Sequence, residues 1–278
     1  MGPVGTGNRL LLTATKLEGD LVLRSWNKKR KRPQWKQEGR HLSCPVENDR
    51  AQWILVATGI GAAAAREGAL EAIRRYAPLK CAVGFGFAGG LVKTARAGDT
   101  VIPTELRHSD RREEPTEWLR MNLASFAPSV EWRKLVTVER VVSTPAEKAA
   151  LHAATGAEAV DMESAIWGEL CRSAGVPWAV VRTILDSGDE SLPCELSRLV
   201  DAFGRTRWST ALPTLTMHPS LVWSVFKFSR RSSVRAAPSF VQTVTGWLAA
   251  EDEKEREQRG EPAIVSARSQ FSRPYPAQ

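Results

Sequence analysis

The stretch of sequence that decides the fold is Val160-Asp161-Met162-Glu163-Ser164, followed by Val180-Val181-Arg182-Thr183-Ile184-Leu185-Asp186. Apolar residues recur at helical spacing after Asp161, and aspartate is a common N-cap, so a helix is predicted to begin there. The second stretch is apolar up to its aspartate and suits a buried strand. If the helix runs antiparallel to the strands on either side, Glu163 and Asp186 emerge together at the carboxyl edge of a parallel sheet. Open α/β sheets bind their ligands at that edge.

Alternating strands and helices are predicted around these stretches. Strands are expected at 9–15, 53–58, 81–86, 100–103, 135–142 and 178–185, and helices at 62–76, at 146–154 and after Asp161. Residues 24–48 are basic and polar, and they predict a hairpin or a loop. This alternation predicts an α/β fold of three layers, α/β/α, in which helices flank a largely parallel or mixed central sheet.

The chain is predicted to divide into three regions. Residues 1–195 form the α/β catalytic domain, and apolar positions in 196–250 predict a helical C-terminal extension packed on it. Residues 251–278 are charged and then rich in Ser, Pro and Gln, which is typical of a disordered tail.

Composition favours a cytoplasmic protein without metal or cofactor. No apolar stretch approaches the ~20 residues of a membrane span, and the N-terminus lacks the apolar region of a signal peptide. The four cysteines have no paired spacing, as expected for free thiols in a reducing compartment. Only His41 and Cys44 are close in sequence, and two ligands do not make a zinc site.

The net charge of +8 permits an anionic partner. The basic run at 28–32 is nevertheless predicted to be a solvated loop, because no nucleic-acid-binding signature accompanies it. Residues 219–228, followed by Arg230 and Arg231, mix aromatic and basic side chains, and a helix of this kind can lie on a membrane surface. Packing on the core or on a partner subunit is the favoured prediction for this segment.

The segment Gly84-Phe85-Gly86-Phe87-Ala88-Gly89 also has the spacing of a dinucleotide-binding motif. A true motif of that kind opens directly into a long helix. Here Gly90, a short segment and Gly98-Asp99 lead into another strand, so NAD binding is not expected.

Four motifs occur in the order seen in the nucleoside phosphorylase/nucleosidase superfamily, which the chain resembles. They are Gly59-Ile60-Gly61, Gly86-Phe87-Ala88-Gly89-Gly90-Leu91 with Gly98-Asp99, residues 160–164 and residues 182–186. Among its branches, the chain looks most like 5′-methylthioadenosine/S-adenosylhomocysteine nucleosidases, futalosine hydrolases and hopanoid-associated nucleosidases. The resemblance implies a purine nucleoside phosphorylase-like fold and a homo-oligomer with active sites near a subunit interface.

By motif position, the resemblance also implies roles for single residues. Glu163 would hold the ribose hydroxyls with Met162 below the sugar, Asp186 would protonate the purine leaving group, and Glu18 would activate water. The substrate would also contact the two glycine-rich segments, at Gly59, Ile60, Gly61, Ala88 and Gly89.

These residue types suit the cleavage of an N-glycosidic bond. Positive charge develops on the ribose and negative charge on the departing base, so a carboxylate near the sugar and an acid near the base both lower the barrier.

Several positions depart from the family pattern. Gly84 and Phe87 stand where phosphorylases of the superfamily carry an arginine and a serine that bind phosphate, which favours water as the nucleophile. Leu185 replaces the serine that usually precedes the catalytic aspartate, and Val141 and Val142 offer no aromatic ring to stack on the base.

The expected function is hydrolysis of a purine nucleoside, in particular a 5′-substituted adenosine such as methylthioadenosine, S-adenosylhomocysteine or an adenosyl-lipid. The alternatives are a phosphate-dependent phosphorylase and a non-catalytic nucleoside-binding protein of the same fold.

Arg182, inside an apolar strand, is costly to bury alone and is expected to pair with a carboxylate.

Overall fold

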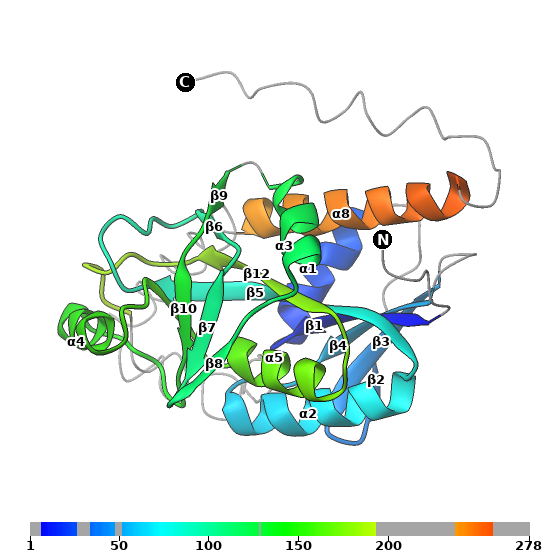
Figure 1. Ribbon diagram of the computed structural model, residues 1–278, viewed down its shortest axis with the longest axis horizontal. Helices are drawn as coiled ribbons and strands as arrows, with labels where there is room; N and C mark the ends of the chain where they lie inside the picture. The colour runs from blue at the N-terminus through cyan, green and yellow to red at the C-terminus, as the bar shows by residue number, and fades with distance from the viewer. Residues whose placement is uncertain (1–6, 27–33, 48–51, 128, 193–236, 258–278) are drawn as a thin grey trace, which may run out of the picture.

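The computed structural model describes residues 7–26, 34–47, 52–127, 129–192 and 237–257. Within these residues, twelve strands form one mixed sheet, and helices cover both of its faces (Figure 1). The predicted three-layer α/β fold with a mixed central sheet is confirmed. The basic run at 28–32 and the segment 219–228 lie outside the described residues.

The centre of the sheet is parallel. β1 (Asn8–Thr13) lies between β4 (Gln52–Ala57) and β5 (Leu79–Gly90), and β12 (Trp178–Ile184) pairs with the other edge of β5. All four strands are apolar and buried, because helices cover both faces of this part of the sheet.

Shorter strands extend the sheet on both sides. They are β2 (Lys36–Glu38), β3 (His41–Glu47), β6 (Thr100–Val101), β7 (Glu105–His108), β8 (Arg111–Glu113), β9 (Val130–Glu131), β10 (Lys134–Thr137) and β11 (Ala159–Asp161). The hairpin of β2 and β3 joins β4, and it lies within the stretch predicted as a hairpin or loop. β11, β10, β7 and β8 continue the sheet from the far end of β5.

β5 is longer than predicted. The predicted strand ended at Gly86, whereas β5 continues through the glycine-rich segment to Gly90. β12 pairs with it as far as Ala88, and β11 pairs with Gly89 and Gly90. Local composition favoured a turn there, and pairing on both edges outweighed it.

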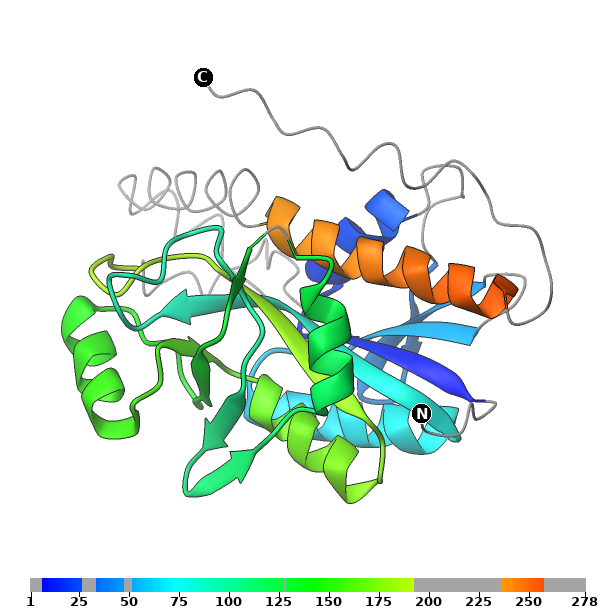
Figure 2. The ribbon, with the colours of Figure 1, turned by 45° about the horizontal axis from the view of Figure 1, so that its top comes forward.

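Five helices cover the two faces. α1 (Lys16–Trp26), α3 (Glu117–Ala124) and α8 (Ala237–Glu257) lie on one face, and α2 (Ala62–Tyr76) and α5 (Ser164–Ser173) lie on the other (Figure 1). A sixth helix, α4 (Pro145–Thr155), lies at one end of the molecule, apart from these two layers, in both views (Figures 1 and 2).

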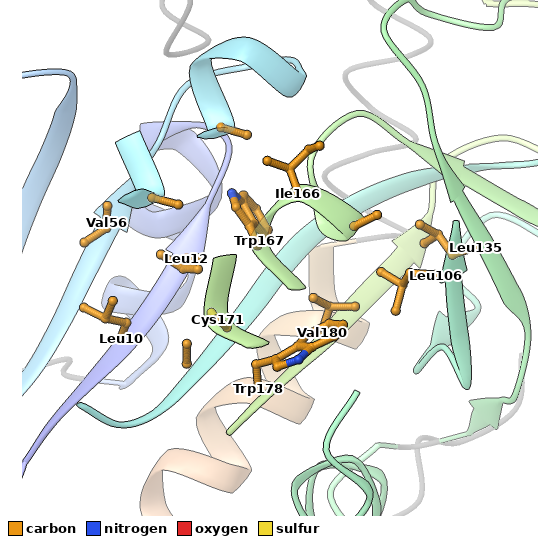
Figure 3. Packing of buried hydrophobic residues seen from close by; sticks show 14 of the residues in the cluster. Leu10, Leu12, Val56, Leu106, Leu135, Ile166, Trp167, Cys171, Trp178 and Val180 are labelled. Carbon is orange, nitrogen blue, oxygen red and sulfur yellow. The ribbon is translucent and has the colours of Figure 1, made fainter. Parts of the chain in front are cut away.

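Each face of the sheet has its own core, since successive residues of a strand point to opposite faces. On β1, Leu10 and Leu12 join the core beneath α2 and α5, whereas Leu11 joins the core beneath α1 and α8. Figure 3 shows the first core, where Trp167 of α5 lies near Leu12.

The helix predictions are met to different degrees. α2 spans the predicted residues 62–76, and α4 extends the predicted helix by one residue at each end. The helix predicted to begin at Asp161 begins at Ser164. α1 was not predicted.

The C-terminal helix α8 packs against α1 and α3. It ends at Glu257, beyond residue 251, where the tail was expected to begin. Among the described helices, none combines the length and the apolar character needed to cross a membrane.

Candidate active site

Arg182 forms the centre of a buried charged cluster. Its side chain lies in the middle of β12 and is fully buried. One guanidinium nitrogen lies 2.7 Å from Asp161 Oδ2 and 3.8 Å from Glu163 Oε2. Its Nε donates a hydrogen bond of 2.9 Å to Ser164 Oγ, and the guanidinium stacks 4.9 Å above the Trp167 ring. The predicted pairing of Arg182 with a carboxylate is confirmed.

Asp161, the last residue of β11, stabilises the turn between β11 and α5. Its carboxylate accepts hydrogen bonds from Thr137 Oγ1 at 2.7 Å and from the Ser164 backbone N–H at 3.1 Å. Asp161 therefore binds an N–H of the first helical turn, although Glu163 occupies the N-cap position of α5. The predicted N-cap at Asp161 was wrong in position, because two residues separate the strand from the helix.

Glu163 contacts the turn that precedes α2. Its Oε1 accepts a hydrogen bond of 2.8 Å from the backbone N–H of Gly61, where φ is +89°. Burial, followed by the nearby charge of Asp161, raises the pKa of Glu163 to about 8. Met162 is half-buried, and its Cε would lie 3.7 Å from a Cβ placed on Gly61. The structure thus brings Glu163 and Met162 together with the turn at residues 59–61.

Glu18 lies in the first turn of α1 and is buried. Its carboxylate accepts hydrogen bonds from the backbone N–H of Thr15 at 2.9 Å and from that of Phe87 at 3.2 Å. Burial raises the pKa of Glu18, against the opposing effect of Arg182.

Gly86 allows Glu18 and Arg182 to approach each other. A Cβ placed on Gly86 would lie 2.6 Å from Arg182 Nη1 and would overlap Glu18 Oε1. Any larger residue at this position of β5 would push the two charged groups apart. Glu18, Asp161 and Glu163 therefore surround one guanidinium, although more than 140 positions separate the first from the other two.

Asp186 follows β12 and is buried beside the end of β5. Its backbone carbonyl accepts a hydrogen bond of 2.7 Å from the Gly90 N–H, and the preceding Leu185 N–H donates to Ala88 O at 2.8 Å. A Cβ placed on Gly89 would lie 3.5 Å from Asp186 Oδ1. Ala88 and Gly89 are thus neighbours of Asp186.

The two predicted acids do not share one parallel edge. β11 is antiparallel to β5, and β12 is parallel to it, so Glu163 and Asp186 follow strands that run in opposite directions on opposite edges of β5. Arg182 lies in β12, and Asp186 lies two residues beyond its end at Ile184. The site therefore has a cluster of carboxylates around Arg182 and has Asp186 beyond the end of the same strand.

Lys148 of α4 belongs to this site and was not predicted. Its ammonium forms an ion pair with Asp186 Oδ2, and both side chains are almost fully buried. In the sequence, Lys148 stands between glutamate and alanine in a polar helix, which is typical of a solvent-exposed lysine. No local signal distinguishes it.

The departures from the family pattern also have structural consequences. A Cβ placed on Gly84 would lie 2.7 Å from the Trp167 ring and 2.8 Å from Val180, so position 84 has no room for a larger side chain. Val141 is exposed to 39%, and Val142 packs against a small cluster that contains Leu91 and Val136. Within the described residues, no group of three or more His, Cys, Asp or Glu side chains is arranged to hold a metal ion.

Curated relatives of this chain include two bacterial nucleosidases. The 5′-methylthioadenosine/S-adenosylhomocysteine nucleosidase of an Exiguobacterium species is 28% identical over 162 residues, which cover 50% of this chain and 69% of the relative. The corresponding nucleosidase of Shewanella baltica is 26% identical over 193 residues, which cover 61% of this chain and 81% of the relative.

Solved structures share the fold. A futalosine hydrolase mutant of Helicobacter pylori aligns with a TM-score of 0.66 at 17% identity, over 90% of this chain and 100% of that chain. The 5′-methylthioadenosine/S-adenosylhomocysteine nucleosidase of Neisseria meningitidis, in complex with methylthio-immucillin-A, aligns with a TM-score of 0.63 at 21% identity, over 87% and 100% of the two chains.

A family model described as the phosphorylase superfamily matches residues 9–207, which include every predicted site residue. This match covers well over half of the 278 residues. The chain belongs to the phosphorylase superfamily and is an enzyme that breaks glycosidic bonds, as a hydrolase or as a phosphorylase.

Proposed function

We propose that this enzyme is a nucleosidase that hydrolyses the N-glycosidic bond of purine nucleosides, in particular 5′-substituted adenosines. The names of the curated relatives support the substrate class. The arrangement of charges around Arg182 supports the choice of water as the nucleophile.

That arrangement is the observation that carries the proposal. Asp161 Oδ2 lies 2.7 Å from Arg182, so the guanidinium is already matched by a carboxylate, and Glu18 and Glu163 place further carboxyl oxygens beside it. The raised pKa of Glu163 reflects burial and this crowding of negative charge. A phosphate dianion would meet further repulsion here, whereas a neutral water molecule would not. Position 84, which is too crowded for a side chain, offers phosphate no additional cation.

The proposed reaction gives each of these residues a role. Glu163 accepts hydrogen bonds from the ribose hydroxyls, and Met162 packs below the sugar. Glu18 takes a proton from water as the water oxygen bonds to the anomeric carbon. The electrons of the broken carbon–nitrogen bond pass to the base, and Asp186 supplies the proton that neutralises it. The products are the free base and the free sugar.

Replacement of Asp186 tests this assignment. In the Asp186→Asn variant we expect kcat to fall by roughly 10²- to 10⁴-fold, because the amide cannot donate an acidic proton to the base. The measurement is base release from methylthioadenosine, with the fold checked by circular dichroism. Asp110→Asn, at an exposed aspartate, is the matched control and should behave like the wild type.

The same assay separates water from phosphate. With and without phosphate, mass spectrometry should identify the free sugar as the product. Strict dependence on phosphate, with a sugar 1-phosphate as product, would show a phosphorylase. Tight nucleoside binding without base release would show a non-catalytic binding protein.

We also propose that the enzyme is a homo-oligomer. Trp118 and Met121 of α3 are more than half exposed, and Trp132 is exposed to 43%. Arg120 of α3 lies 4.8 Å from the Trp132 ring, so Trp132 also lies beside this helix. Exposed apolar patches of this kind mark association surfaces. Sedimentation should show an oligomer that a Trp118→Glu/Met121→Glu double variant dissociates, and a monomeric wild type would contradict the proposal.

A further inference from the structure

Lys148 is held by three oxygen atoms, all at the end of β12. Its Nζ forms the ion pair with Asp186 Oδ2 and donates hydrogen bonds to Ser187 O at 2.8 Å and Glu190 O at 2.7 Å. Three acceptors use all three protons of an ammonium group. The lysine therefore fixes both the Asp186 carboxylate and the turn that follows it.

The position of Lys148 on its helix sets it apart from an ordinary core residue. Its relative exposure is 0%, and it is the only residue of α4 that is buried. α4 lies at the end of the molecule, outside the two helical layers (Figure 2). A surface helix that buries an ammonium is unusual, because removing that charge from water is costly unless a partner compensates for it. Here the compensating partner is Asp186.

We propose that Lys148 is a positioning residue for Asp186, and that its ammonium stabilises the Asp186 carboxylate that forms when the departing base takes a proton. This inference rests on the proposed function. As the carbon–nitrogen bond breaks, its electrons pass to the base and the base takes the proton of Asp186. That transfer leaves a carboxylate in contact with the Lys148 ammonium. The ion pair stabilises the carboxylate as it forms and so lowers the barrier to leaving-group departure.

The same contact has a defined effect on pH dependence. An adjacent ammonium favours the ionised form of a carboxylate, so we expect the alkaline limb of the pH–rate profile to move when Lys148 is replaced. Other described charged groups near the pair include Asp189 and Glu190 on the same turn and Lys93 after β5. Asp189 is exposed, and Glu190 contacts the lysine through its backbone carbonyl. Replacing Lys148 therefore removes a positive charge that contacts Asp186.

The test is the pH profile of kcat/KM for base release from methylthioadenosine by two variants. Lys148→Met keeps the length of the side chain without charge. Lys148→Gln keeps a hydrogen-bond donor without charge, and it provides the same measurement if Lys148→Met does not fold. Lys134→Met, at an exposed lysine of β10, is the matched control. Circular dichroism establishes that each variant is folded.

We expect the rate of both Lys148 variants to fall by about tenfold to a hundredfold, which is less than most of the roughly 10²- to 10⁴-fold range that a whole positioned proton transfer contributes. The alkaline limb of the profile should move to higher pH in both, and the control should keep the rate and the profile of the wild type. A lower rate with an unmoved alkaline limb would mean that Lys148 only supports the fold, and it would overturn the inference. An unchanged rate would also overturn it.

The two proposals fail in different ways. If the wild type releases no base, the proposed function falls and this inference falls with it. If the wild type is active and the Lys148 variants keep its pH profile, only the inference falls.

Discussion

At the scale of single residues, the site depends on a guanidinium shared by several carboxylates. Arg182 pairs directly with Asp161, and its positive charge opposes the burial-driven rise in the pKa of Glu163 and Glu18. Asp161 accepts hydrogen bonds from Thr137 and Ser164, whereas Glu18 and Glu163 also contact glycine-rich segments. Glu18 and Glu163 accept hydrogen bonds from backbone N–H groups of residues 87 and 61, which lie in the segments that the family resemblance assigns to substrate contact.

The raised pKa of Glu163 makes stability depend on pH. The folded protein keeps a proton on Glu163 up to a pH of about 8, whereas the ordinary value is 4.5. The contribution of this proton to stability is therefore fully present below about 4.5, declines as pH rises, and is lost above about 8. In Glu163→Gln that decline should disappear.

Urea unfolding at a series of pH values between 5 and 8.5 checks this prediction, with the difference between wild type and variant as the observable. Glu114→Gln, at an exposed glutamate, is the control and should follow the wild type. A difference between wild type and Glu163→Gln that stays constant across the range would contradict the expected proton uptake.

At the scale of secondary-structure elements, α4 combines strong local capping with little core packing, to which Leu151 contributes. Thr144 and Glu147 form a reciprocal capping box, and Gly156 ends the helix with a φ of +68°. Lys148 is its only buried residue, and its ion pair with Asp186 joins the helix to the end of β12. The capping residues are local signals, which explains why sequence alone predicted α4 almost to the residue.

Removing the cap should loosen α4 more than the rest of the protein. In Thr144→Ala, the Glu147 N–H loses its acceptor at 3.2 Å, at a cost of about 0.5–2 kcal/mol. Hydrogen exchange should show faster exchange of the α4 amides, while the amides of α2 keep their wild-type rates and serve as the internal control. Equal acceleration in both helices would show that α4 unfolds only with the whole domain.

At the scale of the whole molecule, α8 closes the second core. Trp247 packs edge to face on Trp53 of β4, with ring centroids 5.3 Å apart. Phe240 lies against both Phe85 and Phe87 of β5, and the Phe87 N–H is the one that binds Glu18. The C-terminal helix thus packs behind the strand that carries the site.

Truncation of the α8 contact should destabilise the whole domain. Trp247 is 1% exposed, so Trp247→Ala should lower the free energy of unfolding by about 3–5 kcal/mol. Leu17→Ala, at a leucine that is 61% exposed, should change it by less than about 0.5 kcal/mol. Both values come from urea titration, and similar small losses in the two variants would show that α8 is dispensable for the fold.

By itself, the sequence determined several of the elements and the family resemblance. Hydrophobic period and turn residues located α2, α4 and β12, and the order of motifs led to the prediction of Glu18, Glu163 and Asp186 as site residues. These signals are local, since each depends on residues a few positions apart.

The tertiary structure alone decided which groups meet. β11 is antiparallel to β5, the glycine-rich segment extends β5 as a strand, and Lys148 is buried against Asp186. Strand pairing and charge burial join residues 38 to more than 140 positions apart, and no local pattern encodes such contacts.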